Sequence, residues 1–202
     1  MAAALLGAVL TACGSPASPA DPTGGRPPLP SGVEVRFPAA PANAYLSLVT
    51  DQGESVYQIA VPVGATSTAV DSLKWSAQSG GAVDIATLMP AGANVTVTTT
   101  GARALLLEWQ MWQDRNMNGT LETGEALPLM THDQVAYADV PVEVEFTTAT
   151  PRMRQRWSLA QGWSRAEHYV YLPDGTTTYQ RSLSSAPIQR YTLHEPTPLT
   201  SQ

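Results

Sequence analysis

The chain has 202 residues, which is enough for one domain or at most two small ones. Its hydrophobic fraction of 43% suffices for a packed core. Charged residues make up only 14%, the net charge is −6 and no basic run occurs, so nucleic acid is not an expected partner. Cys13 is the single cysteine, which excludes an intrachain disulfide and a cysteine-based zinc site.

An uncharged apolar run occupies residues 2–10. It is shorter than the roughly 20 residues of a membrane-spanning helix, and it has the length of the apolar core of a signal peptide. The sequence Leu10-Thr11-Ala12-Cys13 follows, and it resembles the lipobox of bacterial lipoproteins. The resemblance implies that residues 1–12 are a signal peptide and that Cys13 carries acyl chains such as palmitate after cleavage.

These acyl chains would anchor the protein to a membrane, outside the cytoplasm, in the envelope of a bacterium. In the alternative interpretation, the run is an apolar tail and Cys13 has no such role.

Proline dominates the segment that follows. Eight prolines fall between residues 14 and 42, and serine, alanine and glycine fill much of the rest. This composition has too few large apolar residues for a packed core, and it favours an extended chain. We therefore predict a disordered, lipid-anchored linker over residues 13–42.

Residues 43–195 carry the pattern of an all-β domain. Apolar and β-branched residues alternate with polar ones in short runs, and Gly, Pro and Asp mark turns between the runs. The predicted strands span residues 45–50, 56–61, 68–75, 83–88, 94–99, 104–112, 126–130, 134–137, 142–146, 155–159, 168–172, 176–183 and 188–193. No run has a helical stripe with caps at both ends. The regular spacing predicts a β-sandwich-like (immunoglobulin/transthyretin-like) antiparallel domain, with an alternative sub-boundary near 148–152 and a flexible tail over 196–202.

The sharpest chemical pattern is the segment from Asp114 to Glu125, which reads DRNMNGTLETGE. Oxygen-bearing side chains stand at its positions 1, 3, 5, 9 and 12, and glycine stands at position 6. Calcium takes six to eight oxygen ligands, and this spacing is that of a calcium loop. The predicted ligands are the side chains of Asp114, Asn116, Asn118, Glu122 and Glu125 and the backbone carbonyl of Thr120.

This segment resembles the loop of EF-hand proteins over its 12 residues. The residues before it are predicted as a strand and Pro128 follows it closely, so the helix–loop–helix frame of that family is not expected. The resemblance therefore implies Ca²⁺ ligation alone, in a loop between two strands of an extracellular β domain. Three carboxylates predict a weak dissociation constant, on the order of 10⁻⁴ to 10⁻³ M. The alternative is a polar hairpin loop built on the Asn118-Gly119 turn, without an ion.

The sequence contains no recognisable catalytic motif. It has no Gly-x-Ser-x-Gly elbow, no His-Glu-x-x-His pair and no phosphate-binding glycine loop. We therefore assign no catalytic residue and do not expect an enzyme. The three histidines, His132, His168 and His194, share no short metal-ligand spacing, and we expect surface or hydrogen-bonded histidines.

Together these patterns predict a cell-envelope lipoprotein with a calcium-stabilised β domain in a structural or adhesive role. Its expected partners are the membrane, through the lipid anchor, and an envelope protein or polysaccharide. A carbohydrate-binding module and a small secreted hydrolase stay open as alternatives. For the former, Trp163, which follows Gly162 in an expected turn, is the aromatic residue predicted to be exposed and to stack on a ligand.

Overall fold

The structure, a computed structural model, describes residues 32–150 and 152–196. The predicted signal peptide, Cys13 and the linker before residue 32 lie outside the described residues, as does the predicted tail from residue 197. The strands are β1 (Val33–Arg36), β2 (Ala44–Thr50), β3 (Ser55–Val61), β4 (Ser67–Val70), β5 (Val83–Asp84), β6 (Thr96–Val97), β7 (Arg103–Gln113), β8 (Gln134–Ala138), β9 (Val142–Ala149), β10 (Arg152–Leu159), β11 (Gly162–Tyr171), β12 (Tyr179–Ala186) and β13 (Arg190–Thr192). The helices are α1 (Leu73–Ser76) and the 3₁₀ turns η1 (Ala77–Gly81) and η2 (Ile85–Leu88).

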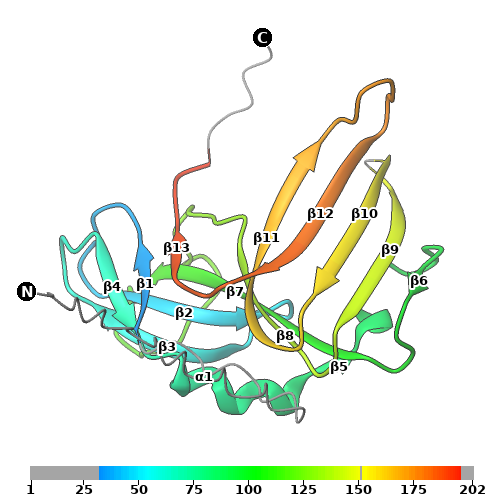
Figure 1. The fold of residues 1–202 in the computed structure, drawn as a ribbon. Coiled ribbons are helices and arrows are strands. Elements are labelled where there is room, and N and C mark those ends of the chain that lie inside the picture. The colour runs from blue at the N-terminus through cyan, green and yellow to red at the C-terminus, as the bar shows by residue number, and fades with distance from the viewer. Residues whose placement is uncertain (1–31, 151, 197–202) are drawn as a thin grey trace, which may run out of the picture.

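These strands form two sheets (Figure 1). The large sheet has the order β3-β2-β7-β8-β11-β12-β10-β9-β6, with β5 paired to β7, and the small sheet has the order β13-β1-β4. The predicted all-β, sandwich-like class is confirmed. Two pairings, β1 with β13 and β10 with β12, are parallel. The order therefore differs in detail from the antiparallel four-plus-three order of an immunoglobulin domain.

The domain begins earlier than the sequence predicted. Strand β1 lies inside the predicted linker, at the centre of the small sheet, and Val33 and Val35 are fully buried. Linker character was therefore wrongly assigned to residues 33–42. Apolar and polar residues alternate from Val33 to Phe37, and the apolar side chains enter the core. The high proline content of residues 14–42 as a whole obscured this short strand pattern, and Pro38 lies just after it.

The first hydrophobic core lies between the small sheet and one face of β2, β7 and β8. Trp109 of β7 is at its centre, with edge-on ring contacts to Trp75 at 5.5 Å and to Tyr191 at 5.9 Å between centroids. Trp75 comes from α1 and Tyr191 from β13, so this core joins the small sheet and the helix to the large sheet. Buried aromatic pairs of this kind stabilise a core beyond the area that they bury.

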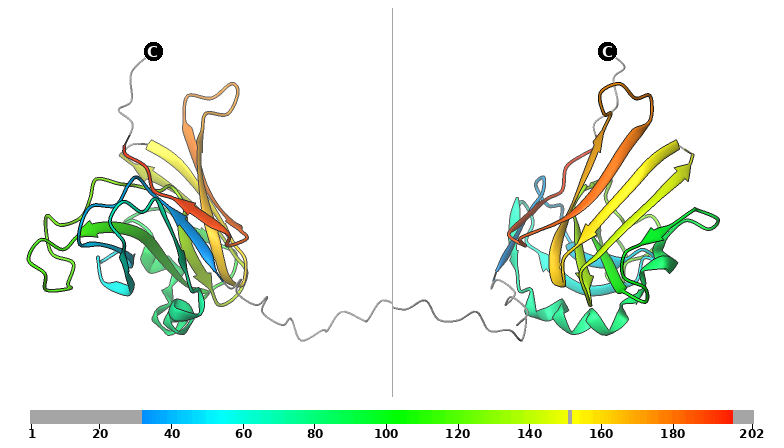
Figure 2. Two further views of the ribbon diagram at one scale, coloured as in Figure 1. Left: turned by 90° about the vertical axis from the view of Figure 1, so that its left-hand side faces the viewer. Right: turned by 45° about the vertical axis from the view of Figure 1, so that its right-hand side comes forward.

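The second core lies on the opposite face of the large sheet. Its members include alanines of β7, β8 and β11 and larger side chains of β9, β10 and β12, and Ile85 of η2 packs against them. Strands β9 to β12 extend beyond this core, and among them the β11–β12 hairpin projects furthest in Figure 2. Because β9 and β10 pair directly, with Arg152 opposite Ala149, the predicted sub-boundary falls inside one hairpin of the large sheet.

Two predicted strands contain short helices instead. Within 68–75 the chain leaves β4 and enters α1, where Asp71 Oδ1 accepts a hydrogen bond from the Leu73 N–H at 3.0 Å. Within 83–88, η2 follows β5, and Asp84 caps it by accepting from the Ala86 N–H at 2.9 Å. Each helix is a single turn with one fully buried anchor, Trp75 or Ile85, which is too short to produce a helical period in the sequence.

The prediction of a strand over residues 126–130 was also wrong. Here the chain makes only isolated bridges, between Trp112 and Ala126 and between Met130 and His194. The long predicted strand over residues 104–112 is confirmed as β7, the longest strand in the described ranges.

Candidate functional site

The predicted calcium loop begins where β7 ends. The N–H of Asp114 donates to the carbonyl of Asn43 at 2.9 Å, and the N–H of Gln113 donates to the carbonyl of Glu125 at 2.9 Å. These two bonds hold the first and last residues of the loop at the same end of the large sheet. The segment before the loop is a strand, as predicted, so the loop has no helix in front of it.

Asp114 is only 3% exposed although it opens a polar loop. Its Oδ1 accepts from the N–H of Asn118 at 3.1 Å and its Oδ2 accepts from the N–H of Gly119 at 2.8 Å. Gly119 has a φ of +71°, a left-handed conformation that glycine adopts without steric cost. This conformation turns the chain so that successive N–H groups point at the Asp114 carboxylate. The Gly119 carbonyl in turn accepts from Gln58 Nε2 of β3 at 3.1 Å.

Glu125 closes the loop and is 5% exposed. Its Oε1 accepts from the N–H of Arg115 at 3.0 Å, and its Oε2 accepts from the N–H of Glu122 at 3.1 Å. Position 12 of the loop is thereby joined to positions 2 and 9. The Asp114 and Glu125 carboxylates thus both face the loop backbone.

The side chains at positions 3, 5 and 9 meet one another. Asn116 Nδ2 donates to Glu122 Oε2 at 3.0 Å, and Asn118 Nδ2 donates to Glu122 Oε1 at 2.7 Å. Asn118 Oδ1 accepts from the N–H of Thr120 at 2.8 Å. The predicted ligands from positions 1 to 12 are therefore brought together by one connected hydrogen-bond network.

The carboxylate and amide oxygens of this network are of the kind that binds a hard cation. Each oxygen of Asp114 and Glu125 accepts one N–H, and a carboxylate oxygen has a second acceptor site. Among the described ion pairs, none involves Asp114, Glu122 or Glu125. Carboxylate and amide oxygens suit Ca²⁺ and not the softer transition metals. Within residues 32–150 and 152–196, no three His, Cys, Asp or Glu side chains gather as a metal-holding group, so an ion in this loop would need oxygens of the asparagines and of a backbone carbonyl as well.

The structure contradicts the predicted exposure of Trp163. The residue lies within β11, is partly buried against the first core, and its ring centroid is 5.2 Å from that of Tyr137. Gly162, expected in a turn, is buried and begins the strand opposite Ala138. A glycine in the sequence usually indicates a turn, but the pairing of Gly162 with Ala138 makes it the first residue of a strand.

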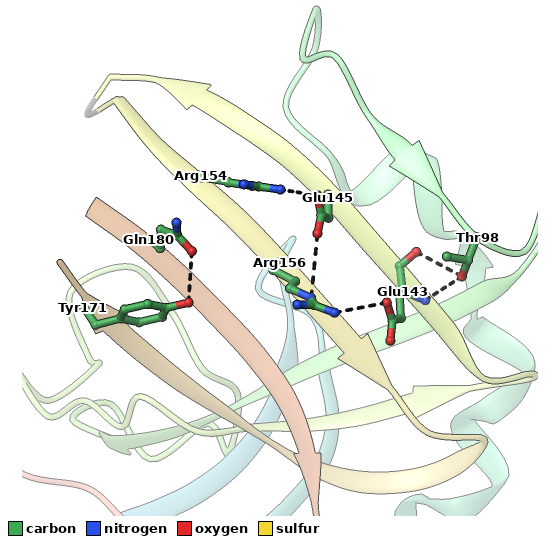
Figure 3. Close-up of polar contacts among 7 residues, drawn as sticks. All are labelled: Thr98, Glu143, Glu145, Arg154, Arg156, Tyr171 and Gln180. Carbon is green, nitrogen blue, oxygen red and sulfur yellow. Dashed lines mark hydrogen bonds and ion pairs between the residues drawn. The ribbon is translucent and has the colours of Figure 1, made fainter. Parts of the chain in front are cut away.

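The exposed aromatic residues are tyrosines near the projecting hairpin instead. Tyr169, Tyr171 and Tyr179 are 56%, 45% and 51% exposed. Tyr171 Oη donates to Gln180 Oε1 at 3.0 Å, and Gln180 stands opposite both Tyr171 and Arg154 in the sheet register. Tyr171 therefore shares one face of the sheet with the arginines of β10 (Figure 3).

Cross-strand ion pairs cover the rest of this face. Arg154 Nη2 is 2.7 Å from Glu145 Oε2, and Arg156 Nη2 is 3.5 Å from Glu143 Oε2 (Figure 3). The hydrogen bond from Arg154 lowers the pKa of the Glu145 carboxyl. We call Glu143, Glu145, Arg154, Arg156, Tyr171 and Gln180 the polar face. Glu143 and Glu145 come from β9 and their arginine partners come from β10, so the pairing of these two strands creates the polar face.

No protein-family model, no curated protein and no solved structure matches this chain. None of the described helices has the length and apolar character needed to cross a membrane.

The caps made by Asp114 yield a stability prediction. Asp114→Ala should lower the free energy of unfolding by about 1–3 kcal/mol even in the presence of a calcium chelator, because the N–H of Gly119 loses its acceptor and the N–H of Asn118 keeps only Asn116 Oδ1. Urea unfolding followed by tryptophan fluorescence measures the loss.

The matched control is Asp174→Ala, which removes an exposed aspartate from the turn between β11 and β12. This control should change the free energy of unfolding by no more than about 0.5 kcal/mol. Equal losses in the two variants would show that the Asp114 carboxylate does not hold the loop.

Proposed function

We propose that the protein is a lipid-anchored protein of a bacterial cell envelope whose β domain binds Ca²⁺ through residues 114–125 and has a structural or adhesive role. The burial of Asp114 and Glu125 at the base of this loop is the observation that supports the proposal most strongly. Buried carboxylates are normally paired with a cation or coordinate a metal, and the described ion pairs supply no cationic partner for these two.

In this proposal the ion would be held by the side chains of Asp114, Asn116, Asn118, Glu122 and Glu125 and by the carbonyl of Thr120. The bound ion supplies positive charge that offsets three carboxylates in one loop. The protein's own contribution is to hold these oxygens in place through backbone N–H groups and to tie the loop to β3 through Gln58. Calcium would then stabilise the end of the large sheet at which β2, β3 and β7 lie side by side.

The proposal predicts that Ca²⁺ stabilises the protein. For a dissociation constant on the order of 10⁻⁴ to 10⁻³ M, roughly 10 mM Ca²⁺ should add about 1–3 kcal/mol and raise the Tm by about 3–10 °C relative to chelator. Glu122→Gln should reduce this gain while leaving the Tm in chelator nearly unchanged, because Glu122 is exposed and the variant keeps its shape and one acceptor oxygen.

Calorimetric titration with CaCl₂ and thermal unfolding measure both effects. Glu54→Gln, in the exposed turn before β3, is the control and should retain the full gain. The absence of both binding heat and a Tm shift in the wild type would refute the calcium proposal.

The proposed anchor depends on the apolar run of residues 2–10 and on Cys13, which completes the lipobox-like sequence. In a bacterial host that processes lipoproteins, Cys13→Ser should move the protein from the detergent-rich to the aqueous phase in phase partition and abolish labelling with a palmitate analogue. Ser15→Ala, two residues further on, is the control and should partition like the wild type. Unchanged partition of Cys13→Ser would contradict acylation at this cysteine.

Polysaccharide binding is the second candidate function, and the exposed tyrosines beside the polar face support it. Tyr171→Ala should weaken binding to a recognised soluble polysaccharide about fivefold or more, a loss of about 1 kcal/mol, as is typical of an aromatic contact residue. Affinity electrophoresis against a panel of polysaccharides measures the change. Leu73→Ala, which removes an exposed apolar side chain from α1, is the control. Retention of full affinity in Tyr171→Ala would exclude this face.

A further inference from the structure

A polar pocket of about 440 Å³ lies where the segment before β8 meets β11 and β13. Its lining includes His132 and Asp133 from that segment, Arg165 from β11, and Arg190 and His194 from the C-terminal part of the chain. We call it the dihistidine pocket. Its volume is within the usual range of small-ligand sites, which carry a few convergent polar groups.

Arg165 offers a hydrogen-bond donor that the protein leaves unused. Its Nη1 donates to the carbonyl of Arg190 at 2.9 Å and its Nη2 bonds Glu167. Its Nε is buried without a hydrogen-bond partner among the described residues, and it is 3.8 Å from Asp133 Oδ2. The Tyr191 hydroxyl is likewise buried without a hydrogen-bond partner among the described residues, and this burial raises its pKa. Arg165 lines the pocket, and its guanidinium carries five N–H donors, of which the two Nη bonds use two.

The two histidines of the pocket face each other across a short distance. Their ring centroids are 5.6 Å apart, with ring planes inclined at 51°. His194 is held by two backbone hydrogen bonds to Met130, each 2.9 Å long, and the His132 carbonyl is bonded to His168 Nδ1. The backbone therefore fixes the pair in place. When both rings are protonated they repel each other, and an anion between them removes that repulsion.

Charged groups of both signs surround the pocket. Arg36 and Arg190 pair with Glu34, Arg165 pairs with Asp133 and Glu167, and Glu195 follows His194 in the lining of the adjacent pocket. Positive charge on the two imidazole rings adds to that of the guanidinium groups. Burial raises the pKa of Asp133, although the charge of Arg165 opposes this effect. Asp133 thus loses its negative charge at a higher pH than an exposed aspartate, which acts in the same direction.

We propose that the dihistidine pocket binds a small oxyanion, such as the carboxylate or phosphate group of a ligand, between His132, His194 and Arg165, and that binding tightens on acidification. An imidazole ring gains positive charge on acidification and then attracts an anion more strongly, so binding is stronger at low pH than at high pH. The proposal is independent of calcium, because none of these residues belongs to the 114–125 loop.

Sulfate is the first probe, because its charge is the same at pH 5.5 and pH 8.0, and acetate is the carboxylate probe. Both are titrated in the presence of chelator, with calorimetry and the imidazole NMR signals as readouts. We expect about tenfold or greater tightening of sulfate binding at pH 5.5, since one pKa unit of coupling corresponds to a tenfold change. The imidazole signals of His132 and His194 should shift when sulfate is added.

His132→Gln is the main variant, because His132 is exposed and glutamine keeps a donor at that position. It should remove most of the pH dependence, and His132→Gln/His194→Gln should leave only the small part that Asp133 contributes. Arg154→Gln, which takes a guanidinium from the polar face, is the control and should bind like the wild type. Equal affinity at both pH values, or equal weakening in the control, would overturn the proposal. Tighter Zn²⁺ binding at pH 8.0 in place of sulfate binding would also overturn it, because a metal needs the neutral rings.

Discussion

Strand β7 contributes side chains from both of its faces to the hydrophobic cores, and both cores are built on it. Leu107 and Trp109 enter the first core, whereas Ala104 on the opposite face enters the second. Successive side chains of a strand point to opposite sides, so one long strand can serve two cores. A slip of one residue would exchange the two sets of side chains, which specifies the register strongly. Near its end, Trp112 Nε1 donates to the buried Ser47 Oγ at 2.9 Å, which fixes β7 against β2.

The loop that begins at Asp114 inherits its position from this strand. Its backbone N–H groups hold the carboxylates of Asp114 and Glu125 inward in the protein alone. Folding by itself therefore orders most of the predicted calcium ligands, and this order would favour binding of the proposed ion. The presence of only three carboxylates acts in the opposite direction and keeps the expected affinity low. In the proposed function, bound Ca²⁺ stabilises the loop and the adjoining end of the β domain in surroundings where Ca²⁺ is plentiful.

Charged side chains have two distinct environments on this fold. On the polar face, Arg154 and Glu145 are 54% and 39% exposed, and solvent screens pairs of this kind so that they add little stability. In the dihistidine pocket, the side chain of Arg165 is 22% exposed and its Nε has no hydrogen-bond partner among the described residues. An unsatisfied buried donor costs about 1–3 kcal/mol.

The sequence by itself determined what depends on neighbours along the chain. Alternation over residues 104–112 gave β7, and the spacing of oxygens from Asp114 to Glu125 gave a loop whose predicted ligands meet in one network. The tertiary structure decided what depends on pairing between distant segments. It placed β1 inside a proline-rich stretch, packed a partly buried Trp163 against the first core, and brought His132 and His194 together. Local periodicity cannot encode such pairs, because strand order and register across the whole chain set which side chains meet.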